Sequence, residues 1–198
     1  MMPRINEYKY QNVHDKKLAE SVCVAAIVQV TAFDPSKMTV DVQPLSKHLQ
    51  NGSYESQPPI LSIPVAFTRS GGFIIRPWIK AGDTGIVVYL DHDLDSTVAG
   101  AKEAKPLTER NHAATDAVFI GGIVAGGFTV GGIPAESLAL ATEDGSVYIA
   151  VTKNGVQIAG DLKVGGSITA EGDVVAAGVS GAHHTHPGDS GGRTGQPG

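Results

Sequence analysis

The stretch that decides the fold is residues 146–164, SVYIAVTKNGVQIAGDLKV. Its apolar residues alternate with small or polar ones, which places Val147, Ile149 and Val151 on one face of an extended strand. Residues 153–155, Lys-Asn-Gly, have the composition of a tight turn, and the alternation resumes after them. This stretch therefore predicts paired strands that carry a single apolar face.

The alternation continues to residue 179 in short pieces that are separated by glycines at 160, 165, 166, 172 and 178. Each piece has an apolar stripe, yet no helix or sheet in the same chain is available to cover it, and a single ribbon would be marginal in water. Three identical chains wrapped around a common axis would bury every stripe and turn the charges outward. A flexible Gly-rich tail is the alternative, but it conflicts with the sustained period of two. We expect an intertwined spike over residues 123–182.

The pattern ends at His184-Thr185-His186-Pro187. In an extended strand, side chains two residues apart share a face, so His184 and His186 could bind one metal ion. Two imidazoles do not complete a metal site, but three copies would supply the six nitrogens of an octahedral transition metal. Residues 183–198 are therefore expected to form a metal-bound apex.

Residues 22–122 predict a small all-β barrel of the OB-fold kind. The expected strands are 22–33, 38–42, 61–68, 73–75, 85–90 and 117–120, and the only plausible helix in this part lies near residues 100–110. Nine of the eleven aromatic residues precede residue 127, whereas 17 of the 25 glycines lie in residues 126–198, so two architectures share the chain. Residues 1–21 precede the barrel as an N-terminal segment, in which the polar residues 1–20 are expected to form a short helix.

Composition excludes several function classes. The isoelectric point is near 5.7 and no basic stripe with interleaved aromatics is present, so nucleic-acid binding has little support. The N-terminus lacks the apolar stretch of a secretory signal, which predicts assembly in the cytoplasm. Residues 117–135 are uncharged but contain six glycines and a proline, so a transmembrane helix is not expected there.

No enzyme is expected. Residues 188–192, Gly-Asp-Ser-Gly-Gly, reproduce the nucleophile signature of chymotrypsin-like proteases, but only six residues follow, too few to complete such a fold. Residues 91–95, Asp-His-Asp-Leu-Asp, are interpreted as a solvated turn, and His112 with Asp116 as a structural pair without a third group. The single cysteine, Cys23, is interpreted as a small buried side chain.

The chain resembles the membrane-piercing central spikes of contractile-tailed bacteriophages. The resemblance lies in the run from residue 160 to 179, followed by residues 183–188, His-His-Thr-His-Pro-Gly, and a Gly-rich end. The barrel domain is similar to one branch of that family in residues 40–44, Val-Asp-Val-Gln-Pro, residues 82–85, Gly-Asp-Thr-Gly, and His112 with residues 116–118, Asp-Ala-Val. His-x-His followed by Pro-Gly is its most specific part.

The resemblance implies a homotrimer with an OB-fold collar, a triple-stranded β-helix and an apex where His184 and His186 of each chain bind one iron ion per trimer. Imidazole also suits other transition metals, and His183 is given no ligand role. The implied location is the tip of the tail baseplate in the virion, joined to the hub or tail tube through the N-terminal domain. Sheath contraction would drive the spike through the host outer membrane. The alternatives are a tail-fibre-like oligosaccharide-binding protein and a metal-dependent hydrolase.

Overall fold

The structure is a computed structural model that describes residues 12, 22–50, 52–123, 125–126, 131–188 and 190–195. Apart from residue 12, the segment 1–21 with its expected helix lies outside the described residues. The chain divides into two compact units, Met1–Thr129 and Val130–Gly198. In the described part, no helix has the length and apolar character that crossing a membrane requires.

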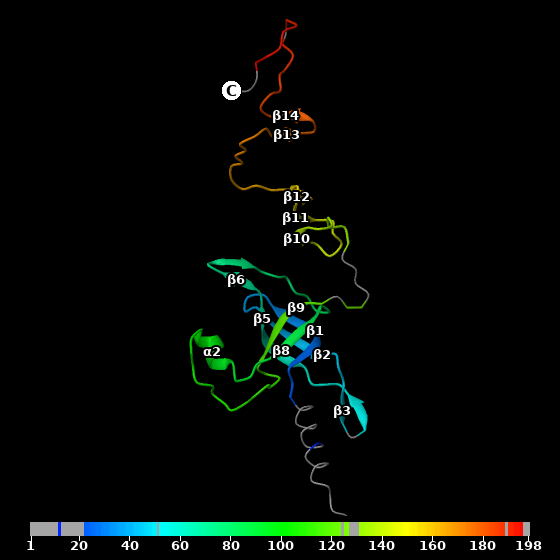
Figure 1. Cartoon of the computed structure of the whole chain (residues 1–198), viewed down its shortest axis with the longest axis vertical. Helices are drawn as coiled ribbons and strands as arrows, with labels where there is room; N and C mark the ends of the chain where they lie inside the picture. The colour runs from blue at the N-terminus through cyan, green and yellow to red at the C-terminus, as the bar shows by residue number, and fades with distance from the viewer. Residues whose placement is uncertain are drawn as a thin grey trace, which may run out of the picture. The chain divides into compact units, whose positions relative to one another are not determined.

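The first unit contains a closed barrel of five strands in the order β1-β2-β5-β9-β8 (Figure 1). These strands are β1 (Ala25–Asp34), β2 (Thr39–Pro44), β5 (Ile60–Ala66), β8 (Thr84–Tyr89) and β9 (Ala117–Gly122). Neighbours are antiparallel except β5 and β9, which are parallel. The third barrel strand therefore pairs with the fifth, which is the arrangement of an OB fold. The expected all-β, OB-fold-like barrel is confirmed.

The barrel is closed around a core of inward-facing aliphatic side chains. Buried and half-buried residues alternate along β2 and β8, as expected for strands with one face on a core. Phe119 is the largest fully buried side chain among the described residues. The core consists of Val28, Val30, Val40, Val42, Ile60, Ile63, Val65, Ile79, Val87, Tyr89, Ala117 and Phe119.

Two hairpin arms and a short helix extend from the barrel (Figure 1). The arms pair β3 (His48–Gln50) with β4 (Ser53–Glu55), and β6 (Thr68–Ser70) with β7 (Phe73–Ile75). Strands β3, β4 and β6 were not expected, because their three residues are mostly polar, whereas the apolar Phe-Ile-Ile of β7 predicted a strand. The helix α2 (Asp95–Gly100) precedes the position expected for it.

The expectation that Cys23, at the start of the barrel, is buried is wrong. Cys23 is exposed rather than buried, and Val22 and Val24 beside it are 48% and 63% exposed. The apolar run of residues 22–27 suggested a buried strand, but pairing starts only at Ala25, so the first residues extend beyond the core.

The second unit contains an antiparallel sheet of β10 (Leu138–Ala141), β11 (Tyr148–Thr152) and β12 (Gly155–Ala159). The turn between β11 and β12 is the one expected at residues 153–155. A two-residue pair, β13 (Val175–Ala176) with β14 (Val179–Ser180), follows. Residues 161–174, where the alternation predicted further strand pieces, form no strand within this single chain.

Packing around Gly85 gives the first prediction. A Cβ atom at this buried glycine of β8 would lie 2.5 Å from two ring atoms of Phe119 and 2.6 Å from the carbonyl oxygen of Gly121. Gly85→Ala should therefore destabilise the barrel by about 1–3 kcal/mol, because the ring and the backbone must both move. Chemical unfolding followed by the fluorescence of Trp78, the only tryptophan, measures this change.

Gly122→Ala is the matched control, because its Cβ would meet only the carbonyl oxygen of Thr84, at an ordinary 3.6 Å. Equal unfolding midpoints for the two variants would contradict the packing described for Gly85.

Candidate functional site

The ring of His184 is oriented by backbone carbonyls. Its Nδ1 lies 2.8 Å from the carbonyl oxygen of Ser180 and 3.1 Å from that of Gly181. A carbonyl oxygen can only accept a hydrogen bond, so Nδ1 carries the proton and donates. The lone pair of the neutral ring is then on Nε2, and a backbone carbonyl on the other ring nitrogen is the usual support of a metal-binding histidine.

His186 is held by the folded-back end of the chain. Its backbone N–H donates to Oγ1 of Thr194 at 2.9 Å, and the N–H of Thr194 donates to the carbonyl oxygen of His186 at 3.0 Å. An isolated antiparallel bridge between Pro187 and Arg193 closes the same loop. These contacts fix the backbone at His186 although residues 184–186 lie in no strand.

The two expected metal ligands lie side by side. The ring centroids of His184 and His186 are 5.1 Å apart with an angle of 90° between the ring planes. Strand alternation was the expected reason, but residues 184–186 lie in a loop after the turn at residues 181–183 and belong to no strand. The backbone N–H of His183 donates a hydrogen bond to Oγ of Ser180 at 2.8 Å.

The donor set of the pair fits a transition metal but is incomplete in one chain. Neutral imidazole nitrogen is a common ligand for such ions. Among the described residues, the only group of three or more potential ligands that lie close together is Asp93, Asp95 and Asp116 in the barrel unit. The histidine pair therefore has no third ligand from the described part of its own chain.

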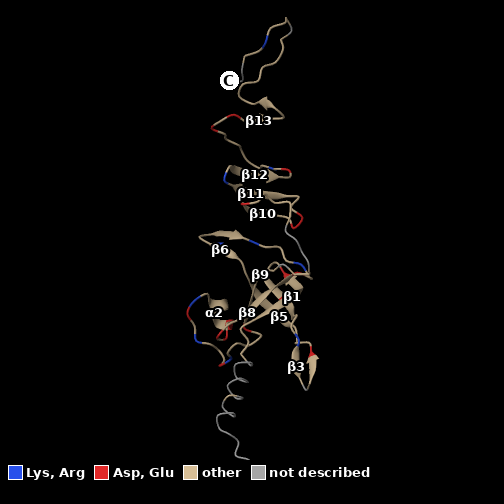
Figure 2. Cartoon of the chain, turned by 45° about the vertical axis from the view of Figure 1, so that its right-hand side comes forward, with Lys and Arg blue, Asp and Glu red and all other residues tan. Residues whose placement is uncertain are grey.

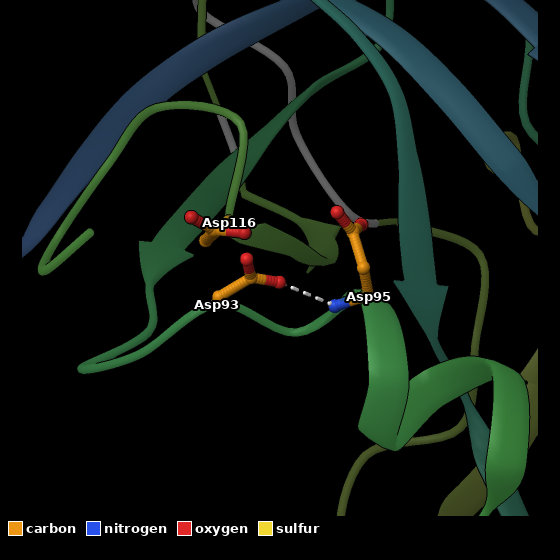
Figure 3. Close-up of side chains that lie close together, drawn as sticks. All are labelled: Asp93, Asp95 and Asp116. Carbon is orange, nitrogen blue, oxygen red and sulfur yellow. Dashed lines mark hydrogen bonds between the residues drawn. The ribbon is translucent and has the colours of Figure 1, made fainter. Parts of the chain in front are cut away.

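The three aspartates form a cluster beside α2 (Figure 3). Asp93 and Asp116 are 3% and 1% exposed, which corrects the interpretation of residues 91–95 as a solvated turn. Local composition could not show this burial, because it depends on Asp116, which lies about 20 residues further along the chain and precedes β9. Figure 3 also shows the hydrogen bond from the Asp95 amide to Asp93, which is 3.0 Å long.

Arg110 neutralises this cluster. Its guanidinium binds Asp116 in a bidentate manner, with Nε 2.9 Å from Oδ2 and Nη2 3.0 Å from Oδ1. The same Nη2 lies 3.3 Å from Oδ2 of Asp93 and 3.5 Å from Oδ2 of Asp95. Because a cation and amide donors already occupy the buried carboxylates, the cluster is a structural feature that ties the α2 loop to β9.

The charges in this cluster also shift pKa values. A hydrogen bond from the Thr108 hydroxyl, then one from the Asp95 amide, and finally the charge of Arg110 lower the pKa of Asp93, although burial opposes them. The hydrogen bond to Asp116 is the main cause that raises the pKa of Arg110. Ionised carboxylates and a charged guanidinium therefore stabilise each other in the folded barrel.

His112 and Asp116 do not form the pair that their spacing suggested. They lie on a loop rather than a helical turn, and Asp116 binds Arg110 instead. Nε2 of His112 lies 3.7 Å from a carboxylate oxygen of the exposed Asp91. Nothing in this arrangement provides a nucleophile with an adjacent base.

The sheet of the second unit carries its large aliphatic side chains on one face. Residues directly opposite in an antiparallel sheet point to the same side. The pairing of the strands therefore gives two rows on that face, Leu138-Val151-Val156 and Leu140-Ile149-Ile158. All six are exposed, from 45% for Ile158 to 79% for Leu138. The other face carries Ala139, Ala150, Gln157, Ala141, Tyr148 and Ala159.

The sequence pattern predicted β11 and β12 but not β10, the strand that completes this face. The Leu-Ala-Leu-Ala alternation could have indicated β10, but it is short and follows a proline and two polar residues. None of the strands β10, β11 and β12 carries a charged residue, and Figure 2 shows the charges of this sheet at its turns. The rows therefore form an apolar face that the described part of the chain leaves uncovered, and this face is called the spike face.

The aspartate cluster gives the second prediction. Arg110→Met should lower the melting temperature of the barrel at neutral pH, because it leaves the buried carboxylates of Asp93 and Asp116 without their cation. The lowered pKa of Asp93 means that its stabilising effect is present above the ordinary value of 3.8 and is lost as the pH falls through the folded value. The difference between variant and wild type should therefore shrink below about pH 3.8.

Thermal unfolding at a series of pH values measures this difference. Arg69→Met, on the exposed β6 arm, removes the same charge and is the control. If the two variants melted alike at neutral pH, the structural role of Arg110 would be wrong.

Comparison with known proteins agrees with the barrel. Residues 27–122 match the family model of the phage protein Gp138 N-terminal domain. The matched range includes β2, β5, β8 and β9 and all but the first two residues of β1. No curated protein matches the chain. The match indicates a phage protein, and residues 27–122 are similar to that domain.

Proposed function

We propose that the chain is a structural protein of the virion, a homotrimeric needle at the tip of the phage tail tube that pierces the host outer membrane during sheath contraction. The phage domain match of residues 27–122 supports a place in the virion. The observation that carries the proposal is the spike face, which the described part of the chain leaves uncovered.

Burial of the spike face requires other copies of the chain. Removing a large aliphatic side chain from water stabilises by about 1.5–3 kcal/mol, so six such residues strongly favour association. Contiguous exposed apolar patches of this kind mark interaction sites in soluble proteins. Identical copies arranged around one axis present the same face to one another and close the assembly without a free edge.

The apolar residues that follow the sheet also require cover from other copies of the chain. Leu162, Ile168 and Val174 are 65%, 71% and 56% exposed, and residues 161–174 form no strand in the single chain. Backbone amides and carbonyls that are removed from water require partners. Strands from neighbouring copies would supply both the hydrogen bonds and the apolar cover, which is the arrangement of an intertwined β-helix.

Three copies are favoured because of the apex. His184 and His186 of three chains would provide six imidazole nitrogens, the number an octahedral transition metal requires. The free Nε2 of His184 supports such binding. Iron is the proposed ion from the family resemblance, although imidazole also suits nickel, copper and zinc. A coordinatively saturated metal ion has no open position at which water could be activated. Its proposed role is therefore structural, because it would hold the three chain ends together.

The proposed work is transmission of force rather than catalysis. An assembly in which three chains interlock must lose many contacts at once to unfold, which raises the kinetic barrier. We propose that the barrel domain joins the needle to the baseplate hub or tail tube, and that the metal-bound apex leads through the membrane.

The third prediction tests assembly through the spike face. Ile149→Asp, in the middle strand of that face, should convert the trimer to monomers, because three carboxylates would be buried together. Gln157→Asp places the same side chain on the opposite face and should leave the trimer intact. Native mass spectrometry of the full chain distinguishes these states. Dissociation of neither variant, or of both equally, would be inconsistent with the proposed role of the spike face.

The fourth prediction tests the apex. Replacing both His184 and His186 with Ala should abolish bound metal and leave the trimer intact, because the spike face supplies most of the association energy. Elemental analysis should find one metal per three wild-type chains and none in the double variant. His183→Ala, at the neighbouring exposed histidine, should keep the metal. One metal per chain, or metal retained by the double variant, would refute the shared site.

A further inference from the structure

The β6–β7 hairpin of the barrel unit, with the segment that returns from it to the core, is called the aromatic arm, residues 68–78 (Figure 1). Residues 68–76 are all exposed. Strand β7 consists of Phe-Ile-Ile, and its first residue, Phe73, is 82% exposed beside the Gly-Gly turn at the tip. Trp78, which precedes the core residue Ile79, is 74% exposed. Large apolar side chains gathered on one exposed element indicate a binding surface.

The base of the aromatic arm is fixed to the barrel. Nη2 of Arg76 donates a hydrogen bond of 2.9 Å to the carbonyl oxygen of Pro35, in the turn between β1 and β2. The ring of Trp78 meets the ring of Phe33 edge to face, with the ring centroids 5.9 Å apart. Because these contacts order the base, the tip can bind a partner at a smaller entropic cost.

The aromatic arm is basic although the chain is acidic. The chain has a net charge of −5, yet residues 56–82 contain three basic residues and no aspartate or glutamate. Asp34, at the turn that the arm contacts, is partly neutralised by Lys37, whose Nζ lies 3.9 Å from its carboxylate. Arms of identical copies would repel one another through their like charges. The expected partner of the arm is therefore anionic.

The apolar side chains of β7 point to both sides of the hairpin. Consecutive residues of a strand face opposite ways, so Phe73 and Ile75 lie on one face and Ile74 on the other. A folded protein would cover one face of so small a hairpin, whereas a lipid phase surrounds an inserted tip on every side. The hairpin is a separate two-stranded sheet, and its unpaired backbone edges restrict insertion to the hydrated headgroup region.

The order of side chains along the aromatic arm matches the interface of a bilayer. Phe73 is nearest the tip, Ile74 follows, and Arg76 and Trp78 are at the base. At a membrane surface, apolar side chains enter the boundary of the acyl chains, whereas tryptophan and arginine lie at the level of the headgroups. Arg69, which lies opposite Ile74, has a flexible stem that allows its guanidinium to reach the phosphates.

We propose that the aromatic arm inserts its tip into the headgroup region of an anionic lipid bilayer. Phe73 and Ile74 enter the boundary of the acyl chains, and the guanidinium of Arg69 binds lipid phosphates. This contact goes beyond the proposed needle, which meets the membrane at its apex, because it gives the barrel unit its own affinity for a lipid surface.

Vesicle binding by the full chain tests the proposal, with the fluorescence of Trp78 as the reporter. Phosphatidylglycerol vesicles should shift the Trp78 emission to shorter wavelength and sediment the protein, and phosphatidylcholine vesicles should bind about tenfold more weakly. Phe73→Ser should weaken binding to phosphatidylglycerol about tenfold, because the apolar side chain at the tip is lost. Arg69→Gln should weaken it about fivefold, because one cation near the phosphates is lost.

The other hairpin arm provides the matched control. Tyr54 of β4 is 71% exposed and lies opposite Leu49, so that arm carries its large apolar side chains on one face. Tyr54→Ser should keep the vesicle affinity of the wild type. The variant with both His184 and His186 replaced by Ala should keep it as well, because the aromatic arm does not use the apex. Phe73 and Tyr54 are both exposed, so neither substitution should unfold the barrel.

Native mass spectrometry of the same samples separates this proposal from the needle. Trimers that do not bind phosphatidylglycerol vesicles would overturn the role of the aromatic arm and leave the needle standing, and an acidic protein would then be its partner. Equal vesicle binding by Phe73→Ser and Tyr54→Ser would overturn that role too. Monomers whose vesicle binding is weakened by Phe73→Ser and not by Tyr54→Ser would support the arm and overturn the needle.

Discussion

The six aliphatic side chains of the spike face are not buried by the described part of the chain that carries them, and the proposed assembly depends on that constraint. In the barrel, each strand turns its apolar residues toward the others, and the sheet closes on itself. In the C-terminal sheet, the three strands place their apolar residues on one side, with no layer of the described chain opposite. This uncovered face is the reason for proposing an assembly of several copies.

The two units therefore differ in how much of their apolar surface they bury within one chain. The barrel has bulky core residues such as Phe119 and Tyr89, and its loops are anchored by the Arg110 cluster. The second unit contains small residues, turns and repeated glycines, and its buried apolar content in one chain amounts to Ala150 among the described residues. In the proposed needle, the barrel would be the attachment domain and the second unit the part that needs other copies.

Sequence predicts the regular parts of this structure well. The alternation of β2, β8, β11 and β12 and the turn at residues 153–155 are local patterns, and each has its counterpart in the fold. The interpretations of Asp93 and Cys23 were wrong, and both depend on residues far away in the sequence. Asp93 is buried because it lies against Arg110 and Asp116. Cys23 is exposed because the pairing of β1 with β8 starts only at Ala25. The rings of His184 and His186 are neighbours, but they lie in a loop that has no periodic signal in the sequence.

The oligomeric state of the wild-type chain tests the central claim most directly. Sedimentation velocity over a dilution series, from micromolar to low nanomolar, measures it without any substitution. The account predicts a single species of three times the 20.5 kDa chain mass that persists throughout the series. A species with the mass of one chain at micromolar concentration would contradict it, because the spike face would then be stable in water without a partner.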